Sequence, residues 1–149
     1  MSALLDVQNL TIDISTAAGT LHAIRDVSFT LNAGQTVSLV GESGCGKSLT
    51  ALAIMNLLPK TATRTATRLR FNETDLSRTS ERRMADIRGN QLSMIFQEPM
   101  TSLNPCYTIG NQLEEALLRH RRASRREARD RAVFLLDKVG ISAAQNRLR

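Results

Sequence analysis

Eight consecutive residues decide how this chain folds: Gly41, Glu42, Ser43, Gly44, Cys45, Gly46, Lys47 and Ser48. They match the pattern G-x-x-x-x-G-K-[S/T], whose glycines let the backbone wrap so that successive N–H groups face anionic oxygens. The pattern needs a strand before it and a helix after it. Thr36 to Val40 is short, β-branched and nearly all apolar apart from Ser38, which predicts a strand buried on both faces in a parallel sheet. Residues 47 to 58 carry apolar side chains at helical spacing until Pro59 stops the run.

The residue types of this loop suit the phosphates of a nucleoside triphosphate, and we expect ATP with Mg²⁺. Lys47 would reach the β- and γ-phosphates, and the Ser48 hydroxyl would complete the magnesium shell. We therefore predict cofactor binding by Gly41 through Leu49, a catalytic role for Lys47 and metal ligation by Ser48. The alternative is a glycine-rich turn with an incidental lysine, which both flanking elements disfavour. Cys45 is interpreted as filling a variable position with an alkylatable thiol.

Upstream of the loop, apolar and polar residues alternate from Leu4 to Ile14 and again from Leu21 to Leu31. This period of two predicts two strands, which we expect to pair antiparallel across the turn at residues 15–20. Downstream, we predict an exposed connection over residues 60–68, a short edge strand over 68–71, a helix over 81–87 and a buried strand over 91–96 that ends at Gln97.

Beyond Pro99 the pattern becomes helical. Apolar residues from Ile109 to Leu117 recur on one helical face. Ser124 and Glu127 predict a capping box at the start of a second helix, and Gly140 predicts its end. The apolar stripe expected on that second helix consists of Ala128, Ala132, Leu135, Leu136 and Val139. Residues 133–137 imitate an apolar strand that ends in Asp137, but the capping box and the spacing favour a helix.

Composition sets outer limits on the fold and the function. The 149 residues are 42% hydrophobic and 23% charged, as in an ordinary globular domain rather than a disordered chain. The longest apolar stretches fall far short of a membrane span, and two cysteines provide no disulfide framework. Residues 1–63 hold three Lys/Arg and four Asp/Glu, whereas residues 64–149 hold seventeen and ten. The net charge of +6 therefore belongs to the second half.

The segment from Arg119 to Arg131 contains seven arginines, counting both ends. A solvated helical face is the favoured interpretation, because Glu127 and Asp130 are interleaved with them. Contact with lipid headgroups or a membrane partner stays open, as does nucleic acid. Nucleic acid is the least favoured of the three, because Tyr107 is the only tyrosine and no aromatic platform for stacking accompanies the arginines.

Two strings together resemble one protein family. The loop with Val40 before it, and the segment Ile95-Phe96-Gln97-Glu98-Pro99-Met100-Thr101-Ser102-Leu103-Asn104-Pro105, are similar to ATP-binding subunits of bacterial ATP-binding-cassette (ABC) importers of the oligopeptide, dipeptide and nickel type. The second string is the more diagnostic, because many families share the first. The resemblance runs from Leu4 to Arg149 and covers the N-terminal part of such a subunit.

The resemblance implies an α/β fold. It would comprise a P-loop NTPase (RecA-like) core with an N-terminal antiparallel β subdomain over residues 1–98, and the beginning of an α-helical subdomain over residues 99–149. Gln97 would act in catalysis and contact the magnesium ion. Glu98 to Pro105 would face the integral membrane permease. A second ABC ATP-binding subunit and, indirectly, an external solute-binding protein would be further partners, at the cytoplasmic face of the bacterial inner membrane.

The sequence also departs from the family pattern. No Leu-Ser-Gly-Gly-Gln signature, Asp-Glu strand or switch histidine occurs, so we expect a cassette that lacks its C-terminal half, binds MgATP and hydrolyses it inefficiently alone. The early hairpin has no aromatic residue for adenine, where His22 or Ile14 could substitute, and Thr67-Arg68 stands where a glycine is frequent. The transported solute stays open among dipeptides, oligopeptides, glutathione-like peptides and nickel. The alternatives are a non-catalytic nucleotide-binding remnant and a soluble non-transport ABC protein.

Overall fold

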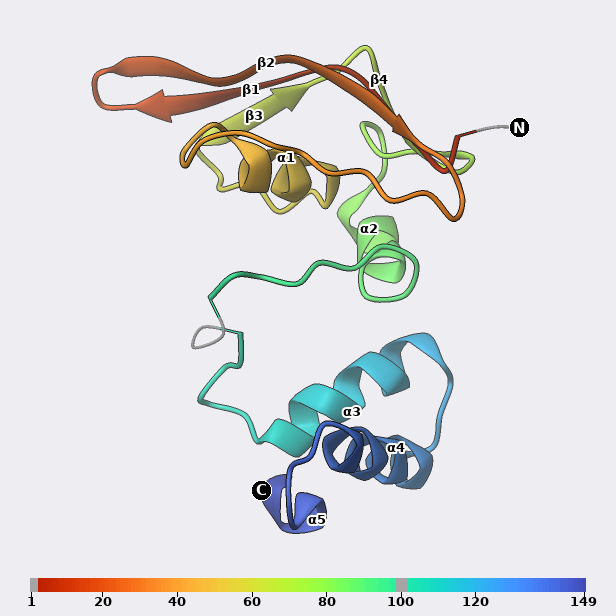
Figure 1. The fold of residues 1–149 in the computed structure, drawn as a ribbon. Helices are drawn as coiled ribbons and strands as arrows, with labels where there is room; N and C mark the ends of the chain where they lie inside the picture. The colour runs from red at the N-terminus through yellow and green to blue at the C-terminus, as the bar shows by residue number, and fades with distance from the viewer. Residues whose placement is uncertain (1–2, 99–101) are drawn as a thin grey trace. The chain divides into compact units, whose positions relative to one another are not determined.

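The computed structural model describes residues 3–98 and 102–149. The chain divides into two compact units, Met1–Arg88 and Gly89–Arg149, each with its own secondary structure (Figure 1). Pro99, Met100 and Thr101, which belong to the segment predicted to contact a permease, lie outside the described residues. The predicted boundary after residue 98 stays a prediction.

The first unit is built on a long antiparallel ribbon. Strand β1 (Leu5–Thr16) pairs with β2 (Gly19–Leu31), with Val7 opposite Phe29 and Ile12 opposite Ile24. The inward positions of β1 are closed to solvent, since Val7, Leu10 and Ile12 are each 0% exposed. The hairpin predicted from the alternating pattern is confirmed.

Three short strands complete the sheet: β3 (Ala62–Thr65), β4 (Arg68–Phe71) and β5 (Thr74–Asp75). The strand order is β2-β1-β4-β5, and β3 pairs with another stretch of β1. Two predictions need correction. The expected connection at residues 60–68 contains β3, whose β-branched threonines suit a strand. The strand at 68–71 exists but is not at the edge, because β5 pairs with its outer side.

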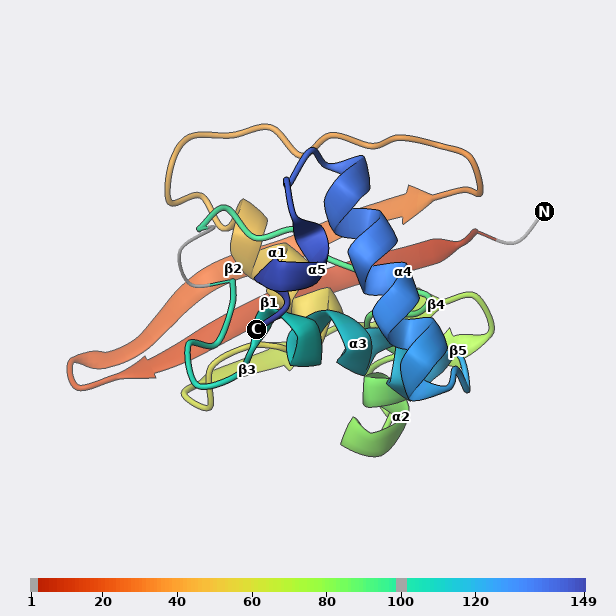
Figure 2. The same ribbon diagram turned by 90° about the horizontal axis from the view of Figure 1, so that it is seen from below.

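Two helices belong to the first unit, α1 (Lys47–Ile54) and α2 (Glu81–Ile87), and α1 lies against one face of the sheet (Figure 2). They share the buried core with the sheet through Ala53, Ile54, Met84 and Ile87. Helix α2 has the predicted bounds. Helix α1 ends four residues before the predicted end, because Asn56 takes a left-handed φ of 55° that helical backbone cannot continue.

Two predicted buried strands are wrong. Residues 36–40 and 91–96 form no strand, and Val40 is 93% and Ile95 97% exposed. A strand of a parallel sheet is stabilised by hydrogen bonds to strands on both sides and by elements covering both faces. Within the described residues neither segment has such a neighbour, so their apolar side chains remain in contact with solvent.

The second unit contains α3 (Ile109–His120), α4 (Arg125–Lys138) and the short α5 (Ala144–Arg147), and α3 packs against α4 (Figure 1). The capping box of Ser124 and Glu127 is confirmed, as is the end of α4 before Gly140. The predicted stripe of α4 is correct only in part. Ala128 and Ala132 are fully buried, whereas Leu135 is 40% and Val139 72% exposed.

Candidate nucleotide-binding site

The loop between residues 41 and 48 has a backbone that only glycine accommodates at several points. Gly44 and Gly46 adopt φ of 82° and 91°, in the left-handed region. A Cβ at Gly41 would lie 2.5 Å from the Cys45 Sγ, and a Cβ at Gly46 would lie 2.9 Å from Cγ1 of Ile24 on β2. The loop is therefore wrapped tightly on itself and set close against the ribbon.

Lys47 closes this loop. Its Nζ donates hydrogen bonds to the Gly41 carbonyl oxygen at 2.7 Å and to the Glu42 carbonyl oxygen at 2.6 Å, and it lies 3.4 Å from the Cys45 Sγ. The ammonium thus joins the end of the loop to its beginning. These contacts use carbonyl oxygens and occupy no backbone N–H group, although the Cys45 N–H of the loop donates to the Glu42 carbonyl oxygen at 3.3 Å.

The N-terminus of α1 opens onto the loop without a side-chain cap. Gly46 is the N-cap residue, and the first helical turn has no acidic residue. The helical hydrogen bonds begin with Thr50, whose N–H donates to the Gly46 carbonyl oxygen at 2.8 Å. The N–H groups of the first turn and the positive end of the helix dipole therefore suit an anion.

Arg64 of β3 ties the other end of α1 to the sheet. Its guanidinium donates to the carbonyl oxygen of Ala53, near the C-terminus of α1, and to that of Leu76 at 2.7 Å. Burial lowers the pKa of Arg64, and the charge of Asp75 opposes that shift. Sequence reasoning missed this residue, because the alternating threonines around it carry too few apolar side chains to predict a strand.

The predicted site residues fall in both units. Gly41 through Leu49 come together around the N-terminus of α1 in the first unit. Gln97 belongs to the second unit and follows the exposed segment 91–96, so it does not end a buried strand as predicted. On the ribbon, the His22 Nδ1 lies 2.7 Å from the Asp13 Oδ1, and Ile14 is half-buried.

The chain matches the model of a known protein family. The family model described as "ABC transporter" matches residues 24–149, which is most of the chain. The chain belongs to the ABC transporter family. Its fold class is accordingly that of a P-loop NTPase, and the resemblance drawn from residues 40–48 and 95–105 is confirmed.

Several relatives agree with this assignment over nearly the whole chain. The dipeptide transport ATP-binding protein DppD of Bacillus subtilis (strain 168) is 49% identical over 100% of this chain and 45% of its own length. Two Brucella abortus (strain 2308) proteins, both named as candidate peptide import ATP-binding proteins, are 49% and 44% identical over 97% of this chain and 44% of their own lengths. The chain thus spans less than half the length of these relatives.

In residues 3–98 and 102–149, no helix combines the length and the apolar character needed to cross a membrane. Over the same ranges, histidine, cysteine and carboxylate side chains form no group of three or more suited to a metal ion.

Proposed function

We propose that this chain is the nucleotide-binding part of an ABC transporter subunit that binds MgATP to energise import of peptides or a related small solute. The observation that carries the proposal is the open N-terminus of α1, facing a glycine loop that Lys47 holds closed. The names of the relatives supply the peptide part of the proposal.

The loop suits ATP because its donors are backbone and ammonium N–H groups, and because Gly41 and Gly46 leave no room for a Cβ. Lys47 would exchange its two carbonyl partners for phosphate oxygens, a stronger pairing because both groups are charged. The Ser48 hydroxyl would ligate Mg²⁺, and Gly41 through Leu49 would surround the phosphates. When bound, MgATP supplies a transferable phosphoryl group. The chain's own residues bind it, orient it and offset its negative charge.

The remaining parts of the proposal concern partners and turnover. Gln97 would contribute to the magnesium site, and Glu98 to Pro105 would contact permease subunits at the cytoplasmic membrane face. A second ATP-binding subunit would pair with this one, and a solute-binding protein would act indirectly. Residues 1–98 would form the core and 99–149 the start of the helical subdomain. We propose that the 149-residue chain alone turns ATP over slowly, because the segment leading to Gln97 lacks neighbouring strands.

The test of nucleotide binding compares the wild type with Lys47→Ala by equilibrium titration with ATP, with and without Mg²⁺. Loss of a charge-assisted contact to phosphate predicts about a tenfold or greater loss of affinity. The matched control is Lys60→Ala, which removes one lysine from an exposed position outside the loop. Equal affinities of wild type and Lys47→Ala for ATP would refute the proposal.

Gln97 is tested by its dependence on magnesium. A neutral amide oxygen contributes less than an ammonium, so Gln97→Ala should lose about two- to fivefold in MgATP affinity. With EDTA the variant should match the wild type, because the proposed contact is to the metal. An equal loss with and without Mg²⁺ would remove Gln97 from the metal site and leave the loop proposal unaffected.

A further inference from the structure

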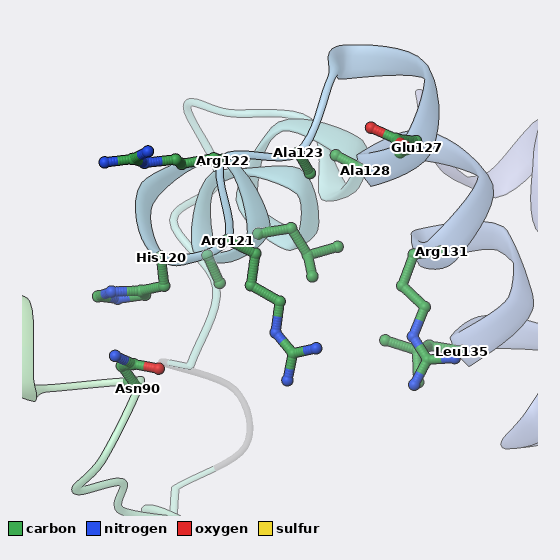
Figure 3. A pocket seen from close by; sticks show the side chains of 12 residues that line it. Asn90, His120, Arg121, Arg122, Ala123, Glu127, Ala128, Arg131 and Leu135 are labelled. Atoms are coloured by element: carbon green, nitrogen blue, oxygen red, sulfur yellow. The ribbon is translucent and has the colours of Figure 1, made fainter.

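The second unit contains a cavity of about 590 Å³ that the proposed nucleotide site does not use (Figure 3). It lies beside the C-terminal end of α3, the connection to α4 and one face of α4. Its volume falls within the range of about 300–1,000 Å³ that is usual for small-ligand sites. Its lining combines apolar side chains, including Leu117 and Leu135, with the cations of Arg121, Arg122 and Arg131.

The one carboxylate among these lining residues is already engaged. Glu127 accepts hydrogen bonds from the Ser124 N–H at 2.8 Å and from the Ser124 hydroxyl at 2.7 Å. Both bonds lower the pKa of Glu127, so its carboxylate stays ionised and directed to the helix cap. Within the described ranges, no salt bridge joins Arg121, Arg122 or Arg131 to an acidic group. The cavity therefore carries a positive charge excess.

Neighbouring arginines of α4 differ from those of the cavity. Arg126 lies 4.0 Å from Asp130 on the same helix, and Arg129 lies 3.9 Å from Glu114 of α3. These two belong to the solvated, charge-balanced helical face expected from the sequence. Arg121, Arg122 and Arg131 depart from that interpretation, because within the described ranges no salt bridge to an acidic group balances their charges.

Two of the cavity arginines share a direction. In Figure 3 the guanidinium groups of Arg121 and Arg131 extend the same way, while Arg122 points elsewhere and Glu127 lies toward the start of α4. The Arg131 guanidinium also stacks 4.8 Å from the centroid of the Phe134 ring. Stacking uses the face of the guanidinium and leaves its N–H groups at the edge free to donate.

We propose that this cavity binds a phosphoryl-bearing anion through Arg121 and Arg131. Planar guanidinium groups match phosphate oxygens bidentately, and two of them lining one cavity suit a doubly charged group. The apolar wall around Leu117 and Leu135 would cover the ester portion of the ligand. The same chemistry is offered by a soluble phosphoester and by the headgroup of an anionic lipid. The inference is independent of the proposed function, because it uses none of residues 41–49.

The test is run on the 149-residue chain carrying Lys47→Ala, so that the P-loop does not contribute to phosphate binding. One arm titrates inorganic pyrophosphate by calorimetry. The other sediments the protein with vesicles of phosphatidylglycerol and phosphatidylcholine, or of phosphatidylcholine alone. Adding Arg121→Gln and Arg131→Gln should weaken binding at least tenfold in whichever arm shows it. The charge-matched control, Arg125→Gln with Arg126→Gln, should change it less than twofold.

Each outcome decides the question. Pyrophosphate binding lost with the cavity arginines identifies a soluble source, and vesicle binding lost in the same way identifies a lipid source. Equal losses in the two double variants would overturn the proposal, because net charge alone would then explain binding. Binding in neither arm would also overturn it. Far-ultraviolet circular dichroism of each variant shows whether a loss of binding reflects unfolding instead. If the double variant is unfolded, the single variant Arg131→Gln replaces it.

Discussion

Strand β1 and the segment 91–96 have similar side chains and opposite surroundings. In β1, Ile12 is 0% exposed, and the strand pairs with β2, β3 and β4 along its length. In the segment 91–96, Ile95 is 97% exposed, and the segment belongs to no sheet. The difference shows that burial of an isoleucine here depends on neighbouring strands rather than on the residue itself.

The P-loop lies between these two extremes. The segment 36–40 that enters it is exposed, with Leu39 at 44% and Val40 at 93%, yet the loop itself is closed. Its closure comes from contacts within a few residues, above all the Lys47 hydrogen bonds to the carbonyls of Gly41 and Glu42. A loop whose two ends are joined by short-range hydrogen bonds therefore forms where a parallel strand does not.

The largest expected effect comes from making the same substitution in both regions. Ile12→Ala removes side-chain atoms from a fully buried site, which typically costs about 2–5 kcal/mol of unfolding free energy. Ile95→Ala alters a side chain that solvent already surrounds and should change stability by less than about 0.5 kcal/mol. Urea titrations of the two variants and the wild type measure both values. Comparable losses would mean that the segment 91–96 is packed in solution.

A smaller effect is expected where the sheet holds the P-loop helix. Arg64→Met keeps a long apolar stem but removes both hydrogen bonds to the carbonyls of Ala53 and Leu76. Hydrogen bonds from charged donors contribute about 1.5–3 kcal/mol, so we expect a loss of about 2 kcal/mol in unfolding free energy. Arg68→Met is the control. Arg68 pairs with Asp6 at 3.1 Å but its side chain is 51% exposed, so the loss should stay below about 1 kcal/mol.

The outcome for Arg64 also bears on the loop. If Arg64→Met were no less stable than Arg68→Met, α1 would be held by its apolar face alone, through Ala53 and Ile54. The Arg64 hydrogen bonds between the sheet and the helix that carries Lys47 would then contribute nothing to the free energy of unfolding.

Elements defined by short-range chemistry could be predicted from the sequence. The hairpin follows from a period of two, the loop from its glycines and lysine, and α4 from the Ser124 and Glu127 pair and from Gly140. In each case the residues that decide the structure lie within a few positions of one another. For the same reason Gly41 through Leu49 could be named as one site without knowledge of the tertiary structure.

Elements that depend on distant partners could not be predicted. The apolar run at 36–40 carries no information on whether a neighbouring strand is present. Strand β3 was hidden because Ala62 to Thr65 has few apolar residues, and its place was set by pairing with β1. The role of Arg64 follows from that pairing, since only the folded chain brings its guanidinium to Ala53 and Leu76.

The smallest expected effect concerns a helix start that is satisfied entirely by its own residues. The pKa of Glu127 is lowered from its usual value of 4.5 by the hydrogen bonds from Ser124. The unfolded chain therefore takes up this proton at a higher pH than the folded one, and the stabilisation is present above pH 4.5 and lost as pH falls through the lower folded value.

Glu127→Gln should be less stable than the wild type at pH 7, and the difference should shrink toward pH 3. Urea titrations followed by far-ultraviolet circular dichroism measure it, with Glu115→Gln on α3 as a control that removes a carboxylate from outside the cap. A difference that persists unchanged at pH 3 would show that the Glu127 charge contributes nothing, and that α4, like β1, depends chiefly on packing against its neighbours.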